Sequence, residues 1–106
     1  MRIEVLYFDG CPNHEALLPR LHEILARTGV SAEIDLRRTA SDDAAQRERF
    51  LGSPTVLNGR DVEPEAERRT DYGLKCRLYR APTGLSGHPE EELLQAALGS
   101  AAGAIA

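Results

Sequence analysis

Two cysteines and a histidine are the residues with the clearest potential for chemistry. Cys11 lies between a short apolar run and a segment with helical spacing, and His14 follows three residues later. At a helix start, unpaired backbone N–H groups and the positive end of the helix dipole favour a thiolate over a thiol. We therefore predict that Cys11 is an exposed nucleophile able to attack disulfides or peroxides. The alternative is a buried, inert residue, because free cysteine is among the most buried residue types.

His14 has two interpretations. Its spacing places the imidazole about one helical turn from the sulfur, where a charged ring would further favour the thiolate. The alternative is an exposed histidine near a helix start. Cys11 and His14 could also hold a soft metal ion together with Cys76. A closed structural zinc site needs four ligands, for which His22, His88 and carboxylates are the remaining candidates.

The second chemical feature is Ser53-Pro54-Thr55, which places a proline at the first residue of a short predicted strand. Proline cannot donate a hydrogen bond to a neighbouring strand, so it is confined to such positions. A cis bond before Pro54 would turn the chain sharply, although about 95% of such bonds are trans. Composition alone therefore favours the trans form.

Cys76 lies in an alternating run, on the same side as Leu74 and Leu78. The apolar side of such a run is expected to face the core, so we predict that Cys76 is a core residue. The alternative is a resolving thiol. If this run pairs antiparallel with residues 55–57, strands ~4.8 Å apart would bring Cys76 near Pro54. Basic residues in this region either bind an anionic thiol such as glutathione or solvate the surface; they are Arg68, Arg69, Lys75, Arg77 and Arg80.

The elements that must position these residues alternate between strands and helices. Hydrophobic periodicity and turn residues predict strands at 2–8, 30–36, 55–57 and 74–79, and helices ending at Gly29, spanning about 41–51, and running through Leu93 to Leu98. A helix between the first two strands makes a right-handed parallel crossover, and the later strands are close enough to pair antiparallel. The predicted fold class is α/β, with a mixed four-stranded sheet flanked by helices on both faces. Residues 1–98 form the expected domain, with 60–75 as a charged surface insertion and 99–106 as a flexible tail.

Length and composition limit the class of protein. A chain of 106 residues suits one compact domain, and 42% hydrophobic with 28% charged residues is ordinary for a globular protein. The net charge of -4 gives no reason to expect nucleic acid or an anionic membrane as partner. Two cysteines are too few for a disulfide-framed secreted domain, and the N-terminus reads as a strand rather than a secretory signal. We therefore expect a cytoplasmic protein, and the sequence predicts no oligomeric state.

Two stretches of this sequence together resemble a known family. Residues 7–14, Tyr-Phe-Asp-Gly-Cys-Pro-Asn-His, and residues 52–59, which contain Gly-Ser-Pro-Thr-Val and Asn-Gly, are similar to thioredoxin-fold proteins. More narrowly, they resemble small bacterial thioredoxin-like proteins, some of whose relatives carry selenocysteine at the nucleophile position. The resemblance implies a thioredoxin-like fold in which Pro54 is cis, packs beside Cys11 and helps to hold a substrate segment. We expect Pro12, Asn13, Ser53 and Thr55 to belong to the same substrate-binding surface.

The sequence departs from the dithiol members of that family in one respect. Such proteins carry a second cysteine where this chain has His14, and that cysteine resolves the mixed disulfide. The sequence therefore predicts a monothiol redox protein in which Cys11, His14 and Pro54 act on a protein disulfide, a small-molecule thiol or a peroxide. No bound cofactor is expected, with glutathione or another thiol as a candidate co-substrate. The alternatives are a soft-metal protein using Cys11, His14 and Cys76, and a non-catalytic adaptor.

Overall fold

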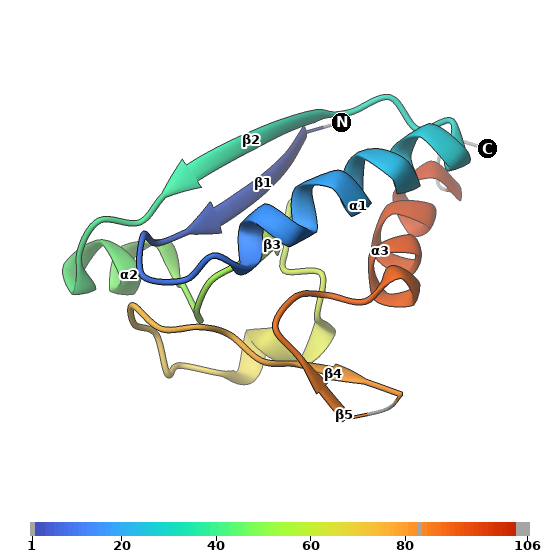
Figure 1. The fold of residues 1–106 in the computed structure, drawn as a ribbon. Helices are drawn as coiled ribbons and strands as arrows, with labels where there is room; N and C mark the ends of the chain where they lie inside the picture. The colour runs from blue at the N-terminus through green and yellow to red at the C-terminus, as the bar shows by residue number, and fades with distance from the viewer. Residues whose placement is uncertain (1, 83, 104–106) are drawn as a thin grey trace.

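A mixed three-stranded sheet forms the centre of the molecule (Figure 1). The structure is a computed structural model that describes residues 2–82 and 84–103, with side chains described as far as residue 98. The sheet has the order β2-β1-β3. β1 (Arg2–Tyr7) pairs parallel with β2 (Glu33–Arg38) and antiparallel with β3 (Thr55–Leu57). The helix α1 (Asn13–Thr28) makes the crossover between the two parallel strands.

The predicted four-stranded sheet is wrong. The fourth strand was expected at 74–79, but β4 (Tyr79–Ala81) pairs antiparallel with β5 (Gly84–Ser86) in a separate two-stranded sheet. The chain after the Asn58-Gly59 turn folds back along β3 instead. There the Val62 N–H donates to the Val56 carbonyl oxygen at 3.0 Å, and Leu57 bridges to Asp61. This return of the chain occupies the edge of β3 on which a fourth strand would have paired.

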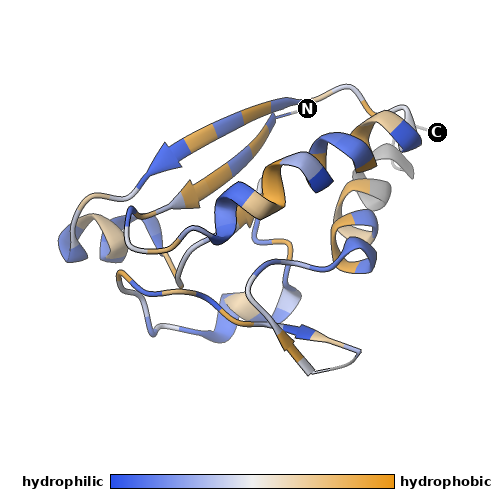
Figure 2. Cartoon of the chain, viewed as in Figure 1, coloured by the Kyte–Doolittle hydropathy of each residue, from blue (hydrophilic) through white to orange (hydrophobic). Residues whose placement is uncertain are grey.

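Apolar side chains cover the sheet on both faces, as the run of apolar residues in β1 predicts. On one face, Ile3 and Val5 pack with the buried positions of α1 and with Leu94 and Leu98 of α3 (Glu91–Gly103). On the other face, Leu6 packs with residues of and after α2 (Asp42–Glu48), namely Ala45 and Phe50. The corresponding orange segments of α1, β1 and α3 are visible in Figure 2. Burial of such side chains contributes about 1.5–3 kcal/mol each and holds the helices on the sheet.

The end of α1 and the start of α2 lie where the sequence predicted them, whereas the start of β2 and the end of α3 do not. Ser41 caps α2 by accepting a hydrogen bond from the Ala44 N–H, and Gly29 ends α1 in a left-handed conformation. β2 begins at Glu33 rather than at residue 30, and Leu36 on this edge strand is 43% exposed, although alternation predicted it to be buried. α3 continues to Gly103, so the predicted end at residue 98 is wrong. The rest of the predicted tail, residues 104–106, lies outside the described residues.

The charged segment after β3 is partly built into the core and is not only a surface insertion. It contains a short 3-10 helix, η1 (Pro64–Arg68), and it buries Val62 and Ala66. In the run that follows, the predicted alternation occurs with the opposite phase. Arg77 and Tyr79 are buried, whereas Leu78 is 57% exposed. Because side chains alternate between the faces of an extended chain, this one-residue difference reverses which side of the whole run faces inward.

Among the described residues, no helix has the length and apolar character needed to cross a membrane.

Gly52, which precedes the Ser53-Pro54 bond, offers a test of how closely the 74–79 run approaches the loop before β3. Gly52 has a φ of 129°, and a Cβ placed on it would lie 2.8 Å from the Cβ of Arg77. We expect Gly52→Ala to lower the free energy of unfolding by about 2 kcal/mol or more, through backbone strain and this collision. Gly59→Ala is the matched control, because its φ is also positive, at 79°, but no atom lies within 4 Å. Equal losses in denaturant unfolding would contradict a close approach at Gly52.

Candidate functional site

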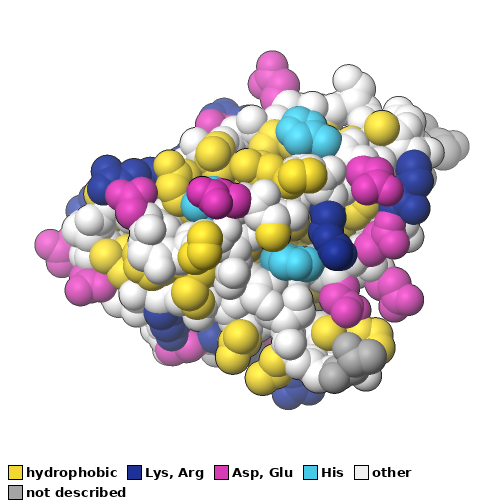
Figure 3. Space-filling model, viewed as in Figure 1, with side chains coloured by type: hydrophobic (Ala, Val, Ile, Leu, Met, Phe, Trp, Pro, Cys, Tyr) yellow, Lys and Arg dark blue, Asp and Glu magenta, His cyan; other side chains and the backbone are white. Residues whose placement is uncertain are grey.

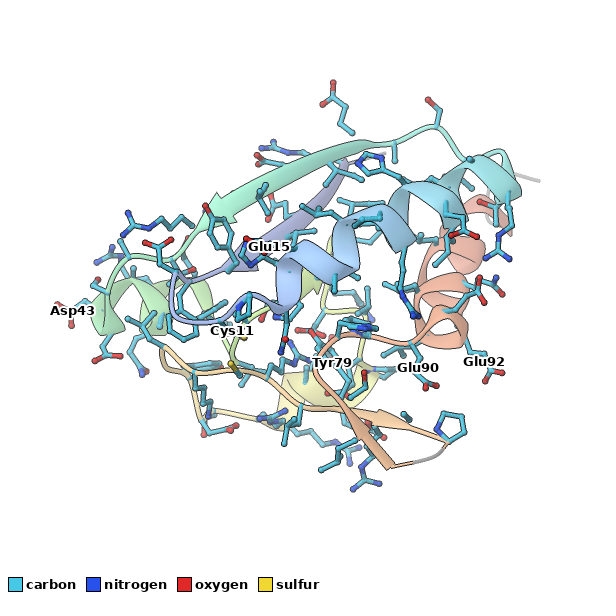
Figure 4. All side chains as sticks on the ribbon, viewed as in Figure 1. Cys11, Glu15, Asp43, Tyr79, Glu90 and Glu92 are labelled. Atoms are coloured by element: carbon cyan, nitrogen blue, oxygen red, sulfur yellow. The ribbon has the colours of Figure 1, made fainter. Side chains whose placement is uncertain are left out.

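Cys11 lies in the loop that joins β1 to α1, where the sequence placed it, but its environment differs from the prediction (Figure 4). The loop is tightened by the Cys11 N–H, which donates to the Phe8 carbonyl oxygen at 3.3 Å, and α1 begins two residues later. The Cys11 side chain is 0% exposed. Its thiol donates a long hydrogen bond of 3.7 Å to the Ser53 carbonyl oxygen. The expectation of an exposed Cys11 is therefore wrong.

The accessible sulfur in this region belongs to Cys76. Cys76 is exposed rather than part of the core, and both cysteines are free thiols. The neighbouring Cys11 thiol is the largest cause of a raised pKa of Cys76, and partial desolvation adds to it. Cys11 is therefore a near neighbour of Cys76. The prediction that Cys76 is a core residue is wrong because the run that carries it has the opposite phase.

Ser53 is the residue whose backbone brings the two cysteines together. Its N–H donates to the Lys75 carbonyl oxygen at 2.8 Å, and its carbonyl oxygen accepts from the Arg77 N–H at 3.0 Å. These two bonds form an isolated parallel bridge between Ser53 and Cys76. The same Ser53 carbonyl oxygen accepts the bond from Cys11. The Ser53 carbonyl oxygen thus contacts the Cys11 thiol directly and holds the backbone segment that carries Cys76.

The Ser53–Pro54 peptide bond is cis, the form that the family resemblance implies and that composition disfavours. Tyr79 donates from its hydroxyl to the Pro54 carbonyl oxygen, and Thr55 donates from Oγ1 to the Gly52 carbonyl oxygen at 2.7 Å. Of the residues expected at a substrate surface, Pro12 is exposed and Asn13 is half-buried. The other two are buried, Ser53 at 0% and Thr55 at 1% exposure. Ser53 and Thr55 therefore contribute to the geometry of the loop and not to an exposed substrate surface.

His14 contacts the backbone of Cys11. Its Nδ1 lies 3.1 Å from the Cys11 carbonyl oxygen, and its ring stacks on Tyr7 with a centroid distance of 4.2 Å. These contacts fix the loop that carries Cys11. Within the described part of the chain, no three His, Cys, Asp or Glu side chains are grouped as ligands of a metal ion. The three-ligand site predicted from Cys11, His14 and Cys76 is therefore not assembled.

The burial of Arg77 was not predicted from the sequence, in which Arg77 belongs to a basic cluster expected at the surface. Arg77 is 1% exposed and donates to both carboxylate oxygens of Asp61, at 2.7 and 2.9 Å. It also donates to Glu63 at 3.2 Å and to Thr55 Oγ1 at 3.3 Å. Its guanidinium lies 4.3 Å from the centroid of the Tyr79 ring. Two acidic residues in the segment before a buried alternating position were the signal that could have identified this network.

The net effect of this environment is to keep Arg77 charged. Burial alone lowers the pKa of Arg77, but its hydrogen bonds to Asp61 and Glu63 and the charge of Asp61 outweigh this effect, so the net shift is upward. Burial raises the pKa of Tyr79, so its hydroxyl stays protonated and can donate to Pro54. Both side chains next to the thiol pair therefore hold one protonation state over the physiological pH range.

Two other basic residues of the cluster are paired with an acidic one. Arg69 and Lys75 both pair with Asp71, at 2.7 and 2.9 Å. Across the face drawn in Figure 3, basic side chains lie beside acidic ones. An anion-binding surface built from the whole cluster is therefore not favoured.

No protein-family model, curated protein or solved structure matches this chain. Function has to be inferred from the residues themselves, and the feature with the clearest chemistry is the pair of thiols, one buried and one accessible, beside the cis Pro54 loop.

The proximity of the thiols predicts a change in the titration of Cys76. Since Cys11 is the largest cause of the raised pKa of Cys76, we expect Cys11→Ala to lower that pKa. The pH profile of Cys76 alkylation by iodoacetamide should move to lower pH, because more thiolate is present at any pH below the wild-type midpoint. Comparing midpoints rather than rates removes changes in accessibility. A midpoint that stays the same or rises would show that the thiols do not interact.

Proposed function

We propose that this protein is a cytoplasmic thiol redox protein whose working unit is the Cys11–Cys76 pair. The observation that carries the proposal is that Ser53 holds a buried and an exposed thiol near each other, since its carbonyl oxygen accepts from the Cys11 thiol and its backbone bridges to Cys76. Reversible disulfide formation needs two sulfurs held close together with one of them accessible to substrate. The resemblance of residues 7–14 and 52–59 to thioredoxin-like proteins supports the same chemistry. A cytoplasmic location suits the proposal, since thiols are kept reduced there.

Cys76 replaces Cys11 as the attacking residue in this proposal, because it is the sulfur that a substrate can reach. The Cys76 thiolate attacks one sulfur of a substrate disulfide, the substrate S–S bond breaks, and the departing thiolate takes up a proton. Cys11, as thiolate, then attacks Cys76, forms the Cys11–Cys76 disulfide and releases the second substrate thiol. The substrate gains two electrons and the protein pair loses two. Two molecules of glutathione, oxidised to their disulfide, would restore the dithiol.

An internal resolving thiol changes the expectation of a monothiol cycle. A monothiol protein depends on an external thiol to release its mixed disulfide. Cys76 and Cys11 both lie beside Ser53, so the second step is intramolecular and proceeds at a high effective concentration. The substrate classes are a protein disulfide, a small-molecule disulfide in place of the small-molecule thiol expected from the sequence, or a peroxide. A peroxide would oxidise Cys76 to a sulfenic acid, with which Cys11 condenses to a disulfide, releasing water.

We expect oxidised glutathione to convert the wild-type protein to an intramolecular disulfide, with loss of two hydrogen atoms in mass and no retained glutathione. Cys11→Ser should instead accumulate a glutathione mixed disulfide on Cys76, because nothing resolves it. Cys76→Ser should react slowly, since Cys11 is buried. Mass spectrometry of alkylated samples reports all three states. If the wild type also stops at a stable mixed disulfide, the two-thiol cycle is refuted.

The placement of both thiols beside Ser53 supports a second candidate function, the binding of a soft metal ion. Thiolates select ions such as Cu(I), and two adjacent sulfurs meet the needs of a two-coordinate soft ion without a third ligand. His14 contacts the Cys11 carbonyl oxygen, so such a site would use Cys11 and Cys76 alone. This differs from the three-ligand site predicted from the sequence.

Native mass spectrometry with mercury(II) or copper(I) tests this second candidate. We expect one ion per chain in the wild type and in His14→Ala, and loss of the ion in both Cys11→Ser and Cys76→Ser, because one thiolate binds less tightly than two. Retention of the ion in Cys76→Ser, or its loss in His14→Ala, would contradict a two-sulfur site. Zinc is the comparison ion, since a closed zinc site needs four ligands.

A further inference from the structure

We propose that Arg77, held by Asp61 and Glu63, is a positioning residue that keeps Cys76 against Cys11. This inference rests on the proposed two-thiol function. Arg77 is adjacent to Cys76 in the chain and has a side chain that is 0% exposed. It does not touch the sulfurs in the contacts described above. Its effect is on the backbone that carries one of them.

The guanidinium joins its own segment to two others, the start of β3 and residues 61–63. It binds Asp61, which follows the turn after β3, in a two-pronged geometry with distances of 2.7 and 2.9 Å. It binds Glu63 at the start of η1 at 3.2 Å and Thr55 at the start of β3 at 3.3 Å. A planar, permanently charged guanidinium is suited to such fixed two-pronged pairing, and a lysine ammonium is not.

The backbone of the same residue completes the attachment. The Arg77 N–H donates to the Ser53 carbonyl oxygen at 3.0 Å, and that oxygen also accepts from the Cys11 thiol. The Arg77 side chain thus holds the Cys76 segment to Asp61 and Glu63. Its main chain holds the same segment to Ser53, which contacts the buried thiol. Gly52 has no side chain, which lets the Arg77 backbone approach to this distance.

A buried charge of this kind restricts where Cys76 can go. Moving the segment away from Ser53 would leave Arg77, Asp61 and Glu63 without partners in a buried setting, which is strongly unfavourable. This restriction keeps Cys76 near Cys11, so the effective concentration of one thiol at the other is high. A role limited to overall stability would not affect this quantity once the protein is folded.

The test compares Arg77→Lys and Asp61→Asn with Leu98→Ala. The first keeps the charge without the two-pronged geometry, and the second weakens the acceptor while keeping its shape. Leu98 is 1% exposed and packs from α3 in the core, so its truncation lowers stability without touching the network. Circular dichroism confirms that each variant is folded at the assay temperature. If Arg77→Lys fails to fold, Asp61→Asn carries the test.

Two readouts separate the positioning role from the redox function. Phenylarsine oxide forms two As–S bonds with a pair of adjacent thiols and releases water, with no electron transfer, so its affinity reports proximity alone. The equilibrium constant for the Cys11–Cys76 disulfide against glutathione reports the redox pair. We expect both to fall by roughly tenfold or more in Arg77→Lys and Asp61→Asn. Leu98→Ala should keep wild-type values in both.

Each outcome decides between the proposals. Wild-type values of both constants in Arg77→Lys and Asp61→Asn would overturn the positioning role and leave the redox pair standing. If the wild type binds the arsenical but forms no disulfide, the redox function fails, and the arsenical affinities of the variants alone judge the positioning role. A wild-type protein that does not bind the arsenical would refute both, because the thiols would not be adjacent.

Discussion

A charged side chain buried between the sheet and the segment that follows it is the constraint on which the rest of this structure depends. Arg77 is surrounded by Asp61, Glu63 and the face of Tyr79. Removing one partner of a buried ion pair costs about 3–5 kcal/mol, against a total stability of about 5–15 kcal/mol for most domains. An exposed pair such as Arg38–Asp9 contributes about 0–1 kcal/mol. The buried network, and not the surface pairs, therefore determines where the 60–78 segment lies.

This network also explains why the central sheet stops at three strands. Asp61 can reach Arg77 only if the chain turns back immediately after β3, and that return places Val62 against Val56. The run that carries Cys76 then meets the sheet ahead of β3, at the single bridge to Ser53. It continues into the separate β4–β5 pair and does not extend the sheet. The same few contacts thus limit the sheet and bring the second thiol to the first.

The sequence predicted those features that depend on local patterns. The strand around Val5, the helix starting after Ser41 and the helix stop at Gly29 all follow from periodicity and capping residues. Cys11 lies where the pattern placed it, between β1 and α1. The exposure of Cys76 could not be predicted, because it depends on which side of the 74–79 run faces inward, and the residue types around Cys11 left a buried thiol as the alternative to an exposed one. Hydropathy assigned the leucines inward, whereas distant carboxylates made it favourable to bury an arginine.

The order of events at the two thiols follows from the same contacts. For Cys11 to attack a substrate, its buried sulfur would first have to be uncovered and its hydrogen bond to Ser53 broken. Attack by Cys76 requires none of this, because its sulfur is already exposed. The raised pKa of Cys76 slows that attack near neutral pH by lowering the thiolate fraction. Exposure of the sulfur, and not the thiolate fraction, therefore makes Cys76 the thiol that meets a substrate first.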